Sequence, residues 1–103
     1  MSEPGAAAGP GRLVIDDGVV PKLPRHAKLR FDKARDKWII LAPERVFELD
    51  QIAYEIVSLC DGKSTVGQVV DTLVAKFGAP HDVIHKDVGE MLQGLADKGF
   101  IVS

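Results

Sequence analysis

The spacing of the apolar residues changes near the middle of this chain, at Asp50, and this change constrains the fold more than any other feature. Before Asp50 the apolar residues fall at every second position or in short unbroken runs, as they do in β-strands. After Asp50 they recur at every third or fourth position, as they do along one face of an α-helix. The pattern therefore predicts an α+β domain in which three strands precede three helices, in the order β-β-β-α-α-α.

The expected sheet is a three-stranded antiparallel meander. Residues 27–32 alternate apolar with charged side chains, which is typical of a strand with one buried face. Trp38 to Ala42 is apolar at every position, so it predicts a central strand that is buried on both faces. Pro43 and Glu44 turn the chain, because proline cannot donate to a ladder of hydrogen bonds. Residues 46–49 then form a short third strand.

Each of the three expected helices has a start signal and a stop signal. Asp50 is a favourable N-cap, and Thr65 to Gln68 has the spacing of a capping box. The third helix is expected to begin between Pro80 and Asp82. Glycine is expected at the end of each helix, at Gly62, Gly78 and Gly99. The predicted buried stripes are Ile52, Ile56, Val57 and Cys60; then Val66, Val69, Val70, Leu73 and Phe77; then Ile84, Val88, Met91, Leu92 and Leu95.

The chain divides into a tail or linker at residues 1–25 and a folded domain at residues 26–103. Met1 to Gly11 is rich in glycine, alanine and proline and has nothing to bury, so it is expected to be disordered or to act as a linker. Arg12 to Arg25 contains two short apolar pieces and two prolines. This second part is expected either to dock weakly on the domain or to tether it to another one.

Composition favours a cytoplasmic binding protein. A lone cysteine, Cys60, excludes an internal disulfide and fits a reducing compartment. Residues 1–25 show no basic stretch followed by an apolar h-region, so export is not expected, and the apolar runs are far shorter than the roughly 20 residues needed to span a bilayer. Charge is uneven: residues 22–37 hold seven Lys or Arg against two Asp, whereas residues 44–103 hold ten Asp or Glu against five Lys or Arg. This asymmetry indicates either electrostatic steering of a partner or an ordinary solvated surface whose opposite faces differ in charge.

No catalytic motif is present, so we expect no enzyme activity, no metal and no cofactor. His81 and His85 lie one helical turn apart, with Asp82 beside them, but a stable zinc site needs three or four ligands. Asp87 and Glu90 are also one turn apart, and such carboxylates on an exposed helix are usually solvated rather than catalytic.

A winged helix-turn-helix-like arrangement, with a small sheet and three helices, raises the alternative of a nucleic-acid-binding module. The third helix would then read the nucleic acid. It carries four acidic residues against two basic ones, and an acidic helix repels phosphates. We therefore expect no nucleic-acid partner and no membrane partner. The alternative function is a winged-helix nucleic-acid-binding module or another protein-interaction module.

An open sheet edge is the remaining candidate for recognition. The outer strands of a meander leave backbone N–H and C=O groups that an extended peptide can use as an added strand. Beside the third strand, the last helix would present a flank made of Val83, Asp87, Glu90 and Gly94, which lies away from its core stripe. Gly94 costs about 1 kcal/mol relative to alanine inside a helix. Close approach of a ligand is one reason to tolerate this cost, and loose selection is the other.

Several short motifs carry a family resemblance over residues 21–102. They are Pro21, Leu29-Arg30-Phe31-Asp32, the run from Trp38 through Leu41-Ala42-Pro43-Glu44-Arg45 to Val46, Leu49-Asp50, Ile56, Cys60-Asp61-Gly62, Asp87-Val88, Met91-Leu92 and Leu95. In these residues the chain resembles the PqqD family, the peptide chaperones of pyrroloquinoline quinone (PQQ) biosynthesis.

The resemblance implies a peptide-recognition element, of the kind that binds precursors of ribosomally made and modified peptides (RiPPs), without catalytic activity. Its members bind the precursor peptide PqqA by β-addition to the third strand, in a groove walled by the third helix, and deliver it to the radical S-adenosylmethionine enzyme PqqE. Some members are fused to another enzyme of the pathway. Carried onto this sequence, the peptide-binding residues are Arg45, Val46, Phe47, Glu48 and Leu49 on the strand, with Val83, Asp87, Glu90 and Met91 on the helix. Trp38 to Ala42 is then core, and the basic stretch from Arg25 to Lys37 is the expected face for the enzyme.

Overall fold

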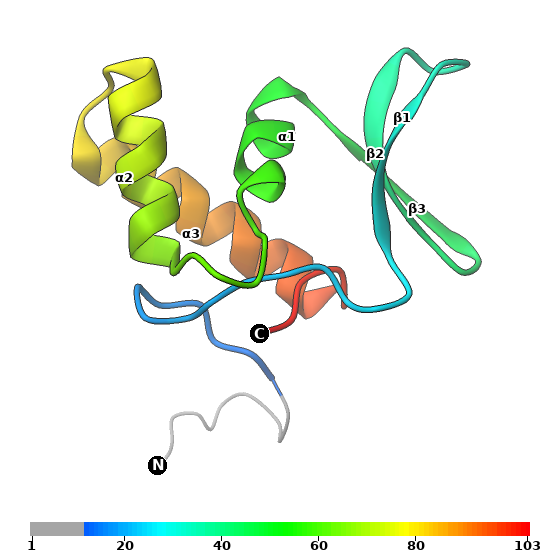
Figure 1. Ribbon diagram of the computed structural model, residues 1–103, viewed down its shortest axis with the longest axis horizontal. Helices are drawn as coiled ribbons and strands as arrows, with labels where there is room; N and C mark the ends of the chain where they lie inside the picture. The colour runs from blue at the N-terminus through cyan, green and yellow to red at the C-terminus, as the bar shows by residue number, and fades with distance from the viewer. Residues whose placement is uncertain (1–11) are drawn as a thin grey trace.

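Three strands precede three helices in the computed structural model, which describes residues 12–103 (Figure 1). The elements are β1 (Lys28–Asp32), β2 (Lys37–Ala42), β3 (Arg45–Leu49), α1 (Gln51–Ser58), α2 (Val66–Phe77) and α3 (His81–Asp97). The predicted order and the predicted α+β class are confirmed. The prediction for Met1 to Gly11 lies outside the described residues.

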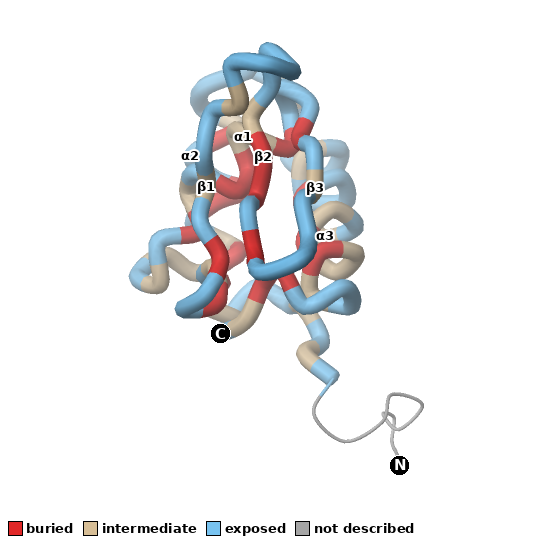
Figure 2. Tube along the Cα trace, turned by 90° about the vertical axis from the view of Figure 1, so that its right-hand side faces the viewer, coloured by how far each residue is buried: buried red, intermediate tan, exposed pale blue. Residues whose placement is uncertain are grey.

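The sheet is an antiparallel meander with the order β1-β2-β3. Leu29 and Phe47 both lie opposite Ile40, so the three side chains share the inner face of the sheet, which the helices cover. Figure 2 shows that β2 is the most buried strand. The prediction that β2 is buried on both faces is wrong at Leu41, which is exposed beside Val46. Among the described residues, no helix packs over that outer face. Ile39 is buried there between its strand neighbours Arg30 and Glu48, whose long side chains cover apolar surface.

The helix starts follow the predicted caps. The Asp50 carboxylate accepts a hydrogen bond of 2.7 Å from the backbone N–H of Ala53. Thr65 and Gln68 form the complete capping box, each side chain accepting from the backbone N–H of the other. The predicted end of α1 at Gly62 is wrong, because the N–H of Cys60 already turns back to the carbonyl of Val57 and the helix ends at Ser58. Satisfied helix ends matter in so short a domain, since each missing cap costs about 1 kcal/mol.

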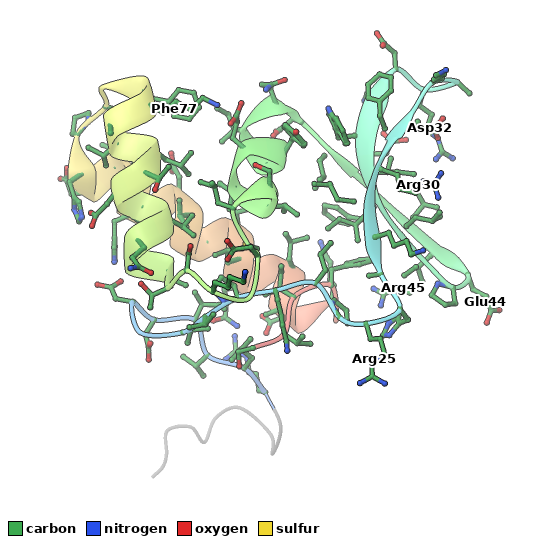
Figure 3. All side chains as sticks on the ribbon, in the orientation of Figure 1. Arg25, Arg30, Asp32, Glu44, Arg45 and Phe77 are labelled. Atoms are coloured by element: carbon green, nitrogen blue, oxygen red, sulfur yellow. The ribbon has the colours of Figure 1, made fainter. Side chains whose placement is uncertain are left out.

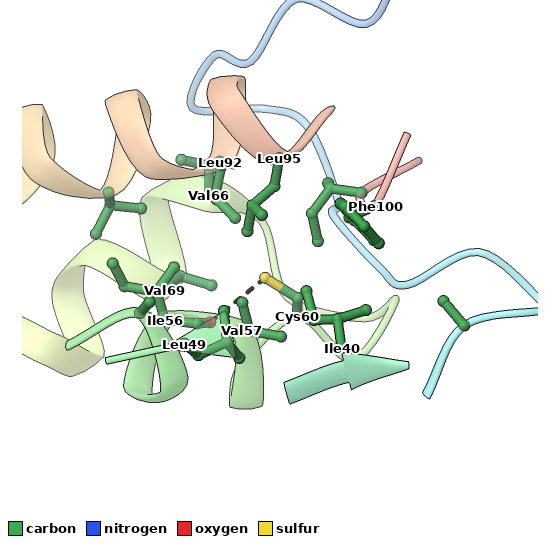
Figure 4. Packing of buried hydrophobic residues seen from close by; sticks show 14 of the residues in the cluster. Ile40, Leu49, Ile56, Val57, Cys60, Val66, Val69, Leu92, Leu95 and Phe100 are labelled. Atoms are coloured by element: carbon green, nitrogen blue, oxygen red, sulfur yellow. Dashed lines mark hydrogen bonds between the residues drawn. The ribbon is translucent and has the colours of Figure 1, made fainter. Parts of the chain in front are cut away.

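One apolar core joins the inner face of the sheet to all three helices. Ile40 and Leu49 from the sheet pack with Ile56, Val69 and Leu92 from the helices (Figure 4). The C-terminal Phe100 and Ile101 close the core. Two residues of the predicted buried stripes are in fact half exposed: Ile52 retains 50% and Phe77 retains 43% of its accessible surface. Both lie at the rim of the space between α1, α2 and α3.

Residues 12–25 dock on the domain, which is one of the two alternatives that the sequence left open. Pro21 is fully buried, and Lys22 exchanges two backbone hydrogen bonds with Val102 at 2.8 and 2.9 Å. On α3, the Gln93 side chain donates to the carbonyl of Leu13 and accepts from the N–H of Ile15. The folded unit therefore begins before residue 26, the predicted boundary. Prolines prevented a strand or helix here, but not packing.

The Cys60 thiol is part of the core. It donates a hydrogen bond of 3.4 Å to the carbonyl of Ile56 (Figure 4). Burial, and secondarily the Asp61 carboxylate, raises the pKa of Cys60 from 9.0 to about 12. A buried thiol of this kind is a small hydrophobe rather than a nucleophile.

This pKa shift predicts a loss of stability at high pH. Because the folded state holds the thiol proton more tightly, ionisation above pH 9 favours the unfolded chain. The contribution is fully present below pH 9 and is lost as the pH rises toward about 12, by up to about 1.4 kcal/mol per pH unit. Urea unfolding at pH 8 and pH 10.5 should show wild type losing more stability than Cys60→Ala. Equal losses in the two proteins would contradict the burial of the thiol.

Among residues 12–103, no helix is both long and apolar enough to cross a membrane.

Candidate functional site

A groove of about 450 Å³ runs between β3, α1 and α3. β3 and α3 face each other across it. β3 supplies Phe47, and the turn into α1 supplies Asp50. α1 supplies Ile52 and Ile56, and the α3 side is formed by Asp87, Glu90, Met91, Gly94 and Leu95, with Lys98 at its end. The groove thus has one strand wall and one helix wall.

The β3 edge beside this groove is open in the part of the chain that the structure describes, because β3 is the last strand of the sheet there. Pro43 and Glu44 form a two-residue turn with Ala42 paired to Arg45, and Glu44 has the positive φ of 62° that the third position of a type II turn requires. The pair that closes such a turn is hydrogen-bonded, and opposed residues alternate from there. Counting along β3, the N–H and C=O groups of Val46 and Glu48 point to the open edge, whereas those of Arg45, Phe47 and Leu49 point to β2.

The same alternation separates the side chains of the five predicted strand residues. Those of Val46 and Glu48 lie on the outer face of the sheet, with Leu41 and Ile39 opposite them. Those of Arg45 and Phe47 lie on the inner face. Of these two, Phe47 lines the groove. Val46 and Glu48 can therefore contact a ligand in the groove only through their backbone.

Leu49 contributes no side chain to the groove lining. Its side chain retains only 3% of its accessible surface and belongs to the core. It lies opposite Trp38 at the end of β3, where the inner face meets α1. In this position the Leu49 side chain supports the strand from within.

The predicted helix residues all lie on one flank of α3, but they line two cavities. Asp87, Glu90 and Met91 line the groove beside β3. Val83 instead lines a neighbouring cavity of about 340 Å³, which also includes Asp87. The prediction missed Ile52 because its helical spacing assigned it to the core. It missed Lys98 because this residue lies beyond the end of α3, where the apolar pattern no longer applies.

Charges of opposite sign lie at the two ends of the groove. Asp50, Asp87 and Glu90 give one end three carboxylates. At the other end, the Lys98 ammonium lies 4.9 Å from the centre of the Phe47 ring, and the Arg45 guanidinium lies 4.2 Å from that of Phe100. Figure 3 shows Arg45 at the turn end of β3. Cations held over aromatic rings stay close to the groove, so a bound chain meets a negative and a positive end.

The histidines considered as metal ligands bind different carboxylates. His85 Nε2 lies 2.6 Å from an Asp17 oxygen, in the docked N-terminal segment, and His81 Nε2 lies 3.7 Å from an Asp71 oxygen of α2. The described part of the chain contains no group of three or more His, Cys, Asp or Glu side chains that could hold a metal ion. The pair instead connects α3 to its neighbours.

A three-stranded sheet with an open edge, followed by three helices whose last member walls a groove, defines a small α+β binding domain of the recognition-element type. The chain belongs to the PqqD family: the family model described as "Coenzyme PQQ synthesis protein D (PqqD)" matches residues 37–101. This family is one of non-catalytic recognition elements, so the prediction that the chain is not an enzyme is confirmed.

Individual relatives agree with this assignment. The chain is 52% identical over 94 residues to a PqqA binding protein of Bradyrhizobium diazoefficiens, covering 91% of each protein. It is 41% identical over 100 residues to the bifunctional coenzyme PQQ synthesis protein C/D of Methylorubrum extorquens, covering 92% of this chain and 27% of that protein. The solution structure of the PqqD part of Methylobacterium extorquens PqqCD, described as a functional, stand-alone RiPP recognition element, superposes with a TM-score of 0.75 at 40% identity. It covers 86% of this chain and 95% of that one.

Proposed function

We propose that this chain binds the precursor peptide PqqA by adding it to β3 as a fourth strand, and presents the bound peptide to the radical S-adenosylmethionine enzyme PqqE. The observation that carries the proposal is the open β3 edge beside the groove of α3. Relatives that are more than 50% identical are PqqA binding proteins, which supports the choice of peptide.

Backbone pairing accounts for a moderate affinity. The N–H and C=O groups of Val46 and Glu48 are available at the edge, and each hydrogen bond contributes roughly 0.5–1.5 kcal/mol net. Apolar side chains of the peptide add burial against Phe47, Ile52 and Met91. A chaperone must also release its peptide, so we expect binding free energies of about −8 to −10 kcal/mol, in the sub-micromolar to micromolar range.

In this proposal the outer face of the sheet contacts PqqE. That face carries the exposed apolar side chains of Leu41 and Val46 and lies across the sheet from the groove. Arg35 and Lys37 pair with Glu48 there, whereas Lys28 and Arg30 have no ion-pair partner among residues 12–103. A peptide added to β3 would extend this sheet, which brings the peptide next to any enzyme bound on the face.

An amide-shift titration with PqqA tests the peptide site. We expect the largest shifts at Arg45 to Leu49 and along α3 from Val83 to Lys98, because both walls of the groove become covered. A peptide of the same composition in scrambled order serves as the control and should shift few amides. Shifts confined to β1, or to the N-terminal segment, would contradict the groove as the binding site.

A further inference from the structure

The groove continues into a second cavity between α1, α2 and α3. This cavity has a volume of about 340 Å³ and shares Ile52, Ile56 and Asp87 with the groove. Its floor consists of the buried side chains of Ile56, Leu73 and Val88, and its rim consists of Ile52, Phe77 and Val83. Apart from Asp87, its lining is apolar, whereas the groove beside β3 is lined by four charged residues.

The rim is unusual for so small a domain, because three large apolar side chains remain half exposed. Ile52 and Phe77 retain 50% and 43% of their surface although they continue the apolar stripes of α1 and α2, and Val83 retains 49%. Figure 3 shows Phe77 at the end of α2 that faces α1. The Lys76 ammonium bridges these helices with a contact of 2.6 Å to Glu55, so α1 and α2 are tied together beside the opening. The cavity is therefore formed before any ligand arrives.

The described part of the N-terminal segment does not fill this cavity. Its lining includes none of residues 12–25: Arg12, Leu13 and Ile15 instead contact Asp97 and Gln93 near the C-terminal end of α3, and Asp17 contacts His85. Gln93 and Asp97 lie at the other end of α3 from Val83, and at roughly 100° per residue His85 projects to the opposite side of the helix from Val83. The opening thus remains accessible from the groove.

We infer that this cavity is a second subsite for the same peptide, which receives one bulky aliphatic or aromatic side chain. The inference rests on the proposed function, since continuity with the groove is what identifies the occupant. The subsite lies beyond the Leu49 end of β3, past Asp50 and Ile52. An antiparallel peptide would place the bulky side chain N-terminal to its paired segment, and a parallel peptide would place it C-terminal.

The test is a Val83→Asp variant titrated with PqqA. Val83 lies in the first turn of α3, where a carboxylate is compatible with the helix dipole, so the variant should fold. Placing a charge on the apolar rim should lower the affinity about ten-fold. Val14→Asp is the matched control, since Val14 is also a half-exposed valine, at 53%, and lies outside both cavities. Its affinity should equal that of wild type.

An alanine scan of PqqA locates the side chain. Replacing one bulky apolar residue of PqqA by alanine should lower its affinity for wild type about ten-fold. The same replacement should hardly change its affinity for Val83→Asp, because the subsite is already lost in that variant. Wild-type affinity in Val83→Asp, with β3 amide shifts retained, would overturn the subsite and leave the proposed function standing. Absence of β3 shifts in wild type would overturn the proposed function itself. Dimerisation of the free wild-type chain that Val83→Asp abolishes would assign the cavity to a second copy and also overturn the subsite.

Discussion

Replacing Val46 by proline is expected to weaken PqqA binding at least ten-fold while the domain stays folded. The N–H of Val46 points to the open edge of β3. Proline therefore removes a hydrogen-bond donor that would pair with the peptide, and not one that pairs with β2. Proline also fixes φ near −65°, whereas an antiparallel strand needs about −140°. Calorimetric titration of PqqA into the variant measures the loss, and circular dichroism reports whether the fold is retained.

Two further variants make this prediction specific to the backbone. Val46→Thr keeps the N–H and changes only a side chain on the outer face, so its affinity for PqqA should match that of wild type. Phe47→Pro removes an N–H that points to β2, so it should destabilise the domain instead. A folded Val46→Pro variant with wild-type affinity would rule out strand addition to β3.

The order of the elements could be predicted from the sequence because it depends on short-range patterns. The change of apolar spacing at Asp50 separates strands from helices, and the capping residues Asp50, Thr65 and Gln68 form the hydrogen bonds expected of them. These short-range patterns do not indicate which residues of each apolar helix stripe are buried by neighbouring elements. Ile52 and Phe77 have core spacing, yet they are half exposed at the rim of the cavity between α1, α2 and α3.

The candidate site was predicted as a set of neighbouring residues, and the structure divides that set by geometry. A strand alternates its faces, so five consecutive residues cannot all contact one ligand in the same way. Leu49 is in the core, Phe47 lines the groove, and Val46 and Glu48 offer only backbone groups there. Assigning each strand residue to one face or to the open edge requires the pairing register of β2 and β3, which the sequence alone does not supply.

Docking of residues 12–25 shows a second limit of sequence patterns. The segment forms no helix or regular strand, so neither period is present to detect. It is held instead by backbone hydrogen bonds at Lys22 and by the Gln93 side chain, which connect positions about 80 residues apart. Contacts between distant positions of this kind leave no short-range signal.

Gly94 is the position where stability and binding should separate most clearly. It lies inside α3 and lines the groove, and a Cβ placed there would have no atom within 4 Å. Alanine at Gly94 should therefore stabilise the domain by about 1 kcal/mol, since glycine is a poor helix former and no clash results. Leucine at Gly94 should keep most of this gain but fill the groove, and should weaken PqqA binding at least ten-fold.

Gly89 provides the matched control for this prediction. It is also inside α3, and a Cβ there also meets no atom within 4 Å, but it lines neither cavity. Gly89→Ala should raise the free energy of unfolding by the same amount as Gly94→Ala and leave PqqA affinity unchanged. Urea unfolding and calorimetric titration of the three variants separate the two effects. Wild-type affinity in Gly94→Leu would show that the peptide does not occupy the groove at Gly94, and that the glycine has no role in binding.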